Sequence, residues 1–170
     1  MKLHRRNSVM DPKIKVVDNF LDTYQFDRLY SVMMGDQISW FYNEYTTREG
    51  DGMMKYTHRF DNPGNYSPFM PIIEPLLVKI NAVGYYRINS NILHRTRFFN
   101  QNTGFHTDGY DCPNTAIFYI NTCNGYTKFK NGPKVMSVAN RMLFFPSDME
   151  HAGFTCTDEE RRLIINFNYE

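Results

Sequence analysis

The sequence has few cysteines and little excess of either charge. Its 170 residues include only three cysteines, Cys112, Cys123 and Cys156, and no two of them have the CxxC spacing. A sparse, odd-numbered set of this kind indicates free thiols in a reducing compartment, so we expect a cytoplasmic protein. The net charge is +1, with no basic stripe outside residues 2–6. This balance disfavours a protein whose main task is to bind phosphate backbones.

Long apolar runs and internal repeats are also absent. No segment approaches the length needed to span a membrane, and residues 1–13 lack the apolar stretch of a signal peptide, so we expect neither. Apolar residues make up 42% of the chain and aromatic residues 16%, which excludes a disordered chain. The length fits one domain with a substantial core, and we expect a single domain over residues 1–170.

The first half of the chain, residues 1–84, carries the helical patterns. Apolar spacing predicts one helix over 22–34 and a second over 71–84, the latter ending at Gly84. The segment 48–69 is rich in turn residues and is predicted to be mostly surface loop, either plain or a lid over a site. We expect this half to supply supporting helices and strands.

The second half, residues 85–170, is built from short β-rich runs separated by turn signals. Asn124-Gly125 and Asn131-Gly132 lie between such runs and predict hairpins. Many short antiparallel strands indicate a sandwich or barrel. The predicted class is therefore mainly β with α (α+β), with the helices of the first half packed on one sheet of the β core.

Three side chains in this half form a candidate metal site. His106 and Asp108 are two residues apart, and in an extended segment such residues point the same way. His151 follows a β-rich run, at a place where the chain turns back. Two histidines and one carboxylate, with other positions open, form the facial triad of non-haem Fe(II) oxygenases. The alternatives are a polar turn before a hairpin, and a zinc hydrolase with Glu150 as its general base.

Six motifs in a fixed order extend this pattern. Their order and spacing resemble the Fe(II)/2-oxoglutarate-dependent dioxygenase superfamily, and most closely its prolyl 4-hydroxylase-like branch, which includes small phage-encoded members. The resemblance covers roughly residues 85–170. The motifs are HTD (106–108), TAIFYIN (115–121), NGYTKF (124–129), VMSVANRMLFFP (135–146), HAGFTC (151–156) and RRLIINFNY (161–169).

The resemblance implies a double-stranded β-helix, a distorted jelly roll, whose catalytic core is residues 85–170. By motif position, His106, Asp108 and His151 would hold Fe(II). Tyr119 matches a tyrosine that hydrogen-bonds the C5 carboxylate of 2-oxoglutarate, although it is equally typical of a core aromatic residue. In the same way, Thr127 and Phe129 match a hairpin motif that is mainly architectural.

The family places a basic residue after the distal histidine, and this chain offers two, Arg161 and Arg162. Side-chain alternation decides between them. The face of Arg161 is otherwise apolar and suits packing against the helices, which leaves Arg161 at the outer edge of the sheet in solvent. The face of Arg162 includes Asn166 and Asn168 and suits a polar pocket. We therefore expect Arg162 to bind the C5 carboxylate.

The implied activity is hydroxylation of a C–H bond, most closely that of a prolyl residue in a peptide or protein. It consumes 2-oxoglutarate and O2 and releases succinate and CO2, with ascorbate as a candidate reductant. If the phage likeness holds, the compartment is the cytoplasm of an infected host. The alternatives are a small-molecule or nucleic-acid substrate, and a non-enzymatic metal-binding β-barrel in a binding or virion-associated protein. Nucleic acid is disfavoured by the near-neutral charge.

Overall fold

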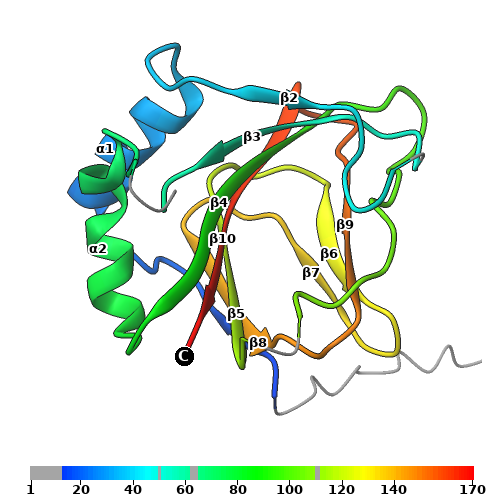
Figure 1. Cartoon of the computed structure of the whole chain (residues 1–170). Coiled ribbons are helices and arrows are strands. Elements are labelled where there is room, and N and C mark those ends of the chain that lie inside the picture. Colours follow the sequence, from blue (N-terminus) through cyan, green and yellow to red (C-terminus); the bar gives the residue numbers. More distant parts are fainter. Residues whose placement is uncertain (1–12, 50, 62–64, 110–111) are drawn as a thin grey trace, which may run out of the picture.

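Two antiparallel β-sheets face each other, and two helices cover the outer side of the larger sheet (Figure 1). The structure is a computed structural model, and it describes residues 13–49, 51–61, 65–109 and 112–170. The order of the elements agrees with the sequence-based prediction: α1 and α2 lie before residue 85, and the β core follows. The outcome confirms a mainly β fold with helices on one sheet.

The two helices begin and end for identifiable reasons. Helix α1 (Thr23–Met34) is capped by Asp22, whose carboxylate accepts the backbone N–H of Gln25 at 2.9 Å. Helix α2 (Met70–Ile80) is capped at its C-terminus by Asn81, which adopts φ +54°. The sequence predicts Gly84 for this position, but asparagine also tolerates the left-handed region, so the helix is shorter than expected.

The larger sheet has seven strands in the order β1-β8-β5-β10-β4-β3-β2. Strand β3 lies within the segment 48–69, which the sequence predicts to be mostly loop, and it pairs with both β2 and β4. The loop prediction is therefore wrong for this strand. The strands are β1 (Lys15–Val17), β2 (Phe41–Asn43), β3 (Lys55–Arg59), β4 (Tyr85–His94), β5 (Asn114–Tyr119), β8 (Arg141–Pro146) and β10 (Arg161–Tyr169).

The smaller sheet has three strands in the order β7-β6-β9: β6 (Tyr126–Phe129), β7 (Lys134–Met136) and β9 (His151–Phe154). The hairpin predicted at Asn131-Gly132 joins β6 to β7. Asn124-Gly125 is different, because it carries the chain from the larger sheet to the smaller one. The chain before β5 also runs along β9, through isolated bridges that pair Asn102 with Phe154 and His106 with His151.

Strand β10 at the centre of the larger sheet separates two hydrophobic cores. Leu163, Ile165 and Phe167 point to the helices and are fully buried with the core residues of α1 and α2. Ile164 points the other way, toward Phe129 of the smaller sheet. The predicted alternation of this strand is confirmed, since its only register irregularity lies at its far end, between residues 168 and 169.

Two further expectations can be compared with the described residues. All three cysteines are buried free thiols, as the composition predicts. Neither α1 nor α2, the helices found among the described residues, is long and apolar enough to cross a membrane.

Candidate metal centre and its cavity

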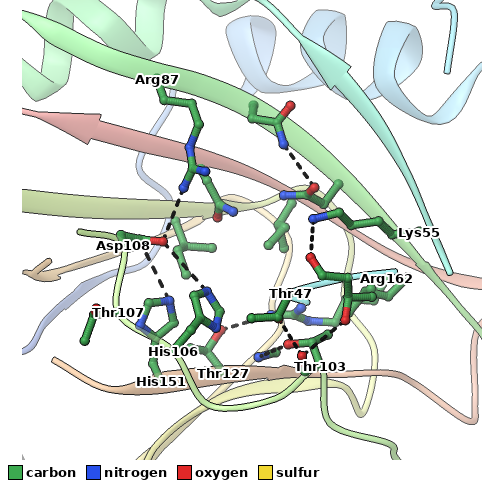
Figure 2. A pocket seen from close by; sticks show the side chains of 18 residues that line it. Thr47, Lys55, Arg87, Thr103, His106, Thr107, Asp108, Thr127, His151 and Arg162 are labelled. Carbon is green, nitrogen blue, oxygen red and sulfur yellow. Dashed lines mark hydrogen bonds and ion pairs between the residues drawn. The ribbon is translucent and has the colours of Figure 1, made fainter. Parts of the chain in front are cut away.

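A cavity of about 310 Å³ opens between the two sheets (Figure 2). Its walls come from the inner face of β10 and β4, from the smaller sheet, and from the segments around residues 46–47 and 103–108. The volume is at the lower end of the range of about 300–1,000 Å³ that is typical of ligand sites. It therefore suits a small co-substrate together with a limited part of another molecule.

The three predicted metal ligands lie together at one end of this cavity. The backbones of His106 and His151 exchange two hydrogen bonds, of 3.0 and 2.9 Å, which fixes the two residues opposite each other. Asp108 follows two residues later and places its carboxylate opposite the Nε2 atoms of both rings (Figure 2). One ligand atom from each residue lies within 4.8 Å of the other two. The structure thus brings together residues that are up to 45 positions apart in the sequence.

The hydrogen-bond partners of both rings suit metal binding. In each ring Nδ1 faces a backbone carbonyl, of Gly104 at 3.1 Å and of Met149 at 3.0 Å, so Nδ1 carries the proton. Each Nε2 is then a free electron-pair donor that faces Asp108, at 3.8 Å for His106 and 3.9 Å for His151. These distances are too long for hydrogen bonds. Adjacent ligands of one ion lie about 3 Å apart and opposite ligands about 4.4 Å apart, so the side chains would close by about 1 Å around a shared ion.

The carboxylate of Asp108 is buried, with a side chain that is 4% exposed. Burial acts to raise its pKa, but the charge that His151 carries when protonated, the hydroxyl of Thr115 at 2.8 Å and the guanidinium of Arg87 at 3.3 Å outweigh it. The net pKa is therefore below the ordinary value, and the group stays ionised. Burial lowers the pKa of His151, with partial opposition from Asp108, so this ring stays neutral. An ionised carboxylate and a neutral imidazole are the forms that bind a metal.

Arg162 forms the floor at the other end of the cavity. Its side chain is fully buried, yet the structure gives its guanidinium one hydrogen bond, from Nη2 to the hydroxyl of Thr127 at 3.0 Å. Its Nε and Nη1 have no partner among the described residues. A buried guanidinium without a counter-charge is unfavourable, and a carboxylate in the cavity would bind Nη1 and the second N–H of Nη2 in a two-pronged contact.

Two glycines make room for this arginine. A Cβ on Gly125 would lie 2.6 Å from the Cδ of Arg162 and 2.9 Å from the carbonyl oxygen of Phe154. A Cβ on Gly153 would lie 3.4 Å from Nη1 of the arginine. Gly153 also lines the cavity, so the unpaired Nη1 lies next to the space a ligand would fill. The role of Gly125 is therefore close packing around Arg162 rather than a hairpin turn.

Tyr119 lies beneath Arg162 instead of lining the cavity. It is fully buried, its ring centroid is 5.4 Å from the guanidinium, and its hydroxyl donates to Thr127 Oγ1 at 2.8 Å. The sequence-based expectation of a hydroxyl that points at a bound carboxylate therefore differs from what the structure shows. Thr127, which the motif assigns an architectural role, lines the cavity instead.

Thr127 is well placed to donate a hydrogen bond into the cavity. Its oxygen accepts from both Tyr119 and Arg162, which occupies its two lone pairs. The hydroxyl hydrogen has no acceptor among the described residues and remains available to a ligand. Arg162 and Thr127 together therefore form a donor pair for an anionic group.

Other residues considered from the sequence lie elsewhere. Arg161 is on the helix side of β10, half-buried rather than in solvent, and donates through Nη2 to the carbonyl of Met34. Glu150 is bound to Lys130 at 2.8 Å on the surface and does not line the cavity. A zinc hydrolase that uses Glu150 as its base thus has no support here.

Two cationic residues of the cavity were not singled out from the sequence. Arg87 on β4 contacts Asp108, and Lys55 on β3 reaches the same space from the next strand (Figure 2). Lys55 lies in the segment predicted to be mostly loop, so only strand pairing brings it here. The alternation of β4 was the one available signal for Arg87, because it places 87, 89, 91 and 93 on a single face.

Comparisons with known proteins agree with this geometry at the level of the fold. No protein-family model matches the sequence, and no curated protein matches it. Solved structures do match, among them the three described next, which have identities of 13–14%. An oxidoreductase of the 2OG-Fe(II) oxygenase family from Burkholderia pseudomallei gives a TM-score of 0.67 at 13% identity, over 92% of this chain and 85% of that one.

Two further structures extend the comparison. A prolyl hydroxylase from Trichoplax adhaerens, in complex with a hypoxia inducible factor oxygen degradation domain peptide fragment, gives a TM-score of 0.66 at 13% identity, over 92% of this chain and 83% of that one. The non-heme alpha ketoglutarate dependent epimerase SnoN, from nogalamycin biosynthesis, gives a TM-score of 0.63 at 14% identity. The match covers 93% of this chain and 77% of that one. These likenesses confirm the predicted double-stranded β-helix. Because different reactions occur on this fold, the activity has to be argued from the site.

Proposed function

We propose that this protein is an Fe(II)- and 2-oxoglutarate-dependent oxygenase that hydroxylates a C–H bond. The observation that carries the proposal is the pairing of two sites in one cavity. A His-Asp-His cluster lies at one end and a buried arginine with two unpaired donors at the other. A dicarboxylate that also binds a metal would satisfy both ends at once. The fold shared with a 2OG-Fe(II) oxygenase family member supports the same conclusion.

In this proposal His106, Asp108 and His151 hold the ion. Bound Fe(II) would supply open coordination positions for 2-oxoglutarate and O2, and the oxidising power for C–H hydroxylation with release of succinate and CO2. Arg162 and Thr127 bind the C5 carboxylate of 2-oxoglutarate and so fix the orientation of its other end toward the metal ligands. Tyr119 contributes indirectly, because it holds Thr127 and packs under the guanidinium.

Part of the cavity wall is apolar. Leu93, Ile117 and Ile164 are buried apolar residues of the larger sheet, and all three line the cavity. Apolar neighbours strengthen the contact between a buried guanidinium and a carboxylate. We propose that residues 1–170 act as one domain, in which residues 85–170 form the catalytic core.

For the substrate we propose a prolyl residue in a peptide or protein. One of the similar folds belongs to a prolyl hydroxylase bound to a peptide fragment, which supports this choice. The small cavity also favours entry of one side chain rather than a bulky molecule.

The three free thiols suit a cytoplasmic location, and ascorbate would serve as reductant.

The test measures conversion of 2-oxoglutarate to succinate by the purified protein with Fe(II) and O2. We expect slow succinate release without substrate, and faster release with proline-containing peptides that gain the mass of one oxygen atom. The variants His106→Ala and Arg162→Ala should lose the activity, while Arg161→Ala, which changes the neighbouring residue on the opposite face, should retain it. Absence of succinate from metal-loaded wild-type protein under all conditions would reject the proposal.

A further inference from the structure

The cavity has a second cationic region that the proposed co-substrate site does not use. The region is formed by Lys55 on β3 and Arg87 on β4, on the wall opposite the smaller sheet (Figure 2). Arg162 lies deeper in the cavity, on the neighbouring strand β10 of the same sheet, and Thr127 lies on β6 of the smaller sheet. If 2-oxoglutarate extends from the metal ligands to Arg162, the wall formed by β3 and β4 is left for the substrate.

Lys55 lacks an ionic partner in the part of the chain that the structure describes. Its ammonium donates to the carbonyl oxygen of Thr46, which leaves two of its three donors free. The side chain is half-buried, and no salt bridge involving Lys55 is found among the described residues. Burial and repulsion by Arg87 lower its pKa, with Asp51 in partial opposition. The cavity therefore holds a cation in a place that disfavours it.

Asp51 does not neutralise Lys55 effectively. Its carboxylate accepts hydrogen bonds from the backbone N–H groups of Thr46, Thr47 and Met53 and from the hydroxyl of Thr46, at 2.7–3.0 Å. It does not line the cavity. Its charge is thus committed to these hydrogen bonds with residues 46, 47 and 53.

The guanidinium of Arg87 uses two of its nitrogens in hydrogen bonds within the protein and leaves the third available. Its Nε donates to Asn168 at 2.9 Å and its Nη2 to Asp108 at 3.3 Å. Its Nη1 has no partner among the described residues, and the side chain is 45% exposed. Arg87 therefore reaches from the metal end to the opening of the cavity, where an entering molecule would meet it.

The charge balance shows what kind of group is missing. The described lining residues carry three cations, Lys55, Arg87 and Arg162, against the single carboxylate of Asp108, an excess of two positive charges. A divalent metal ion and the 2-oxoglutarate dianion cancel each other and leave this excess unchanged. An anionic substrate group would reduce it, and would satisfy donors that have no partner in the protein.

We propose that the substrate carries a carboxylate that binds between Lys55 and Arg87, next to the carbon that is hydroxylated. This inference rests on the proposed oxygenase function and specifies its substrate class as an acid. The carboxylate belongs either to an acidic residue beside the target proline of a peptide, or to a free amino or imino acid. Nucleic acid, the other anionic class, fits less well because the chain has a net charge of only +1.

The test uses matched probes that differ only in charge. Binding is measured by calorimetry on Zn(II)-loaded protein with 2-oxoglutarate and without turnover. The probes are a short peptide with Glu-Pro and the same peptide with Gln-Pro, N-acetylproline and N-acetylprolinamide, and a short single-stranded oligonucleotide. We expect the carboxylate member of one pair to bind at least about tenfold more tightly than its amide. The pair that shows this preference identifies the source of the carboxylate.

Variants then place the group. Lys55→Met should abolish the preference for the carboxylate, Lys55→Arg should retain most of it, and Lys79→Met should leave it unchanged. Lys79 is a matched control, because its ammonium also donates to a backbone carbonyl, that of Phe20, but on helix α2 outside the cavity. Lys55→Glu should transfer the preference to a Lys-Pro peptide.

Several results would overturn the inference. Equal affinity for both members of each pair would do so, as would tighter, Lys55-dependent binding of the oligonucleotide. So would a Lys55→Met variant that loses 2-oxoglutarate affinity as strongly as probe affinity, since Lys55 would then belong to the co-substrate site. Failure of the oxygenase function is distinguishable, because it appears as absence of succinate while the charge-dependent binding persists.

Discussion

Replacement of Arg162 by methionine should make the ligand-free protein more stable and at the same time insensitive to 2-oxoglutarate. In the free protein this guanidinium is fully buried, has one hydrogen bond, and leaves Nε and Nη1 without partners. Each unsatisfied buried donor costs about 1–3 kcal/mol, and apolar replacement of buried charges often stabilises by about 1–4 kcal/mol. Methionine keeps most of the aliphatic stem that packs against Gly125. We therefore expect stabilisation of about 1–3 kcal/mol.

The same substitution should remove the response to the co-substrate. For the wild-type protein, 2-oxoglutarate at one hundred times its dissociation constant adds about 2.7 kcal/mol of stability. For a chain of this length, 1 kcal/mol corresponds to a shift of about 2–4 °C in the melting temperature. The wild-type protein should thus gain about 5–11 °C. Without 2-oxoglutarate, the Arg162→Met variant should have a melting temperature several degrees above that of the wild type. Addition of 2-oxoglutarate should raise it hardly at all.

The assay is thermal unfolding of both proteins with Mn(II), which replaces Fe(II) without turnover, in the presence and absence of 2-oxoglutarate. Arg161→Met is the control, because that side chain lies on the opposite face and donates to the carbonyl of Met34. It should lose a little stability and keep the full response. A variant at position 162 that is less stable without 2-oxoglutarate, yet stabilised by it as strongly as the wild type, would refute the assigned role of Arg162.

Three further outcomes are expected. His106→Ala should abolish Mn(II) binding, measured by calorimetry, with little change in unfolding, since this side chain is 32% exposed; retained binding would contradict the ligand assignment. Thr127→Val should raise the KM for 2-oxoglutarate more than Tyr119→Phe does, because Thr127 both bonds Arg162 and has a free donor; the reverse order would favour the tyrosine as the direct contact. The third outcome concerns Asp51, whose contribution to stability depends on pH. Burial acts to raise its pKa, but its hydrogen bonds to residues 46–48 outweigh this and hold the pKa well below the ordinary value. The stabilisation is therefore complete above the unfolded pKa of about 3.9 and is lost as the pH falls toward the folded value. Hydrogen exchange of residues 46–48 should increase on acidification in the wild type but be already fast and pH-insensitive, after correction for intrinsic rates, in Asp51→Asn.

Local patterns in the sequence predicted the features that depend on a single element. The alternation of β10 is set by backbone geometry alone, so it placed Arg162 and Leu163 on opposite faces without knowledge of the partners of the strand. The cap at Asp22 is equally local, since acceptor and donor are three residues apart. The metal ligands required more, and the order of the family motifs supplied it.

Features that depend on which strands meet could not be predicted. The dipeptide Asn124-Gly125 has the composition of a tight hairpin, but the strands on either side join different sheets, and its glycine serves packing against Arg162. The sequence around Lys55 reads as loop because it is surrounded by glycine, asparagine and proline. Its pairing with β4 is decided by long-range contacts, so its position in the cavity has no local signature.

The two ends of the cavity are connected through the inner face of one strand. Arg162 is the second residue of β10, and Asn168, near the end of the strand, donates to Thr115, which in turn holds Asp108. Positions 162 and 168 lie on the same face of this strand, so the backbone hydrogen bonds of the sheet fix Arg162 relative to the residues that hold Asp108. A rigid spacing of this kind selects ligands by length. A dicarboxylate one carbon shorter than 2-oxoglutarate should therefore bind the metal or Arg162, but not both, and its affinity should be nearly unaffected by Arg162→Met.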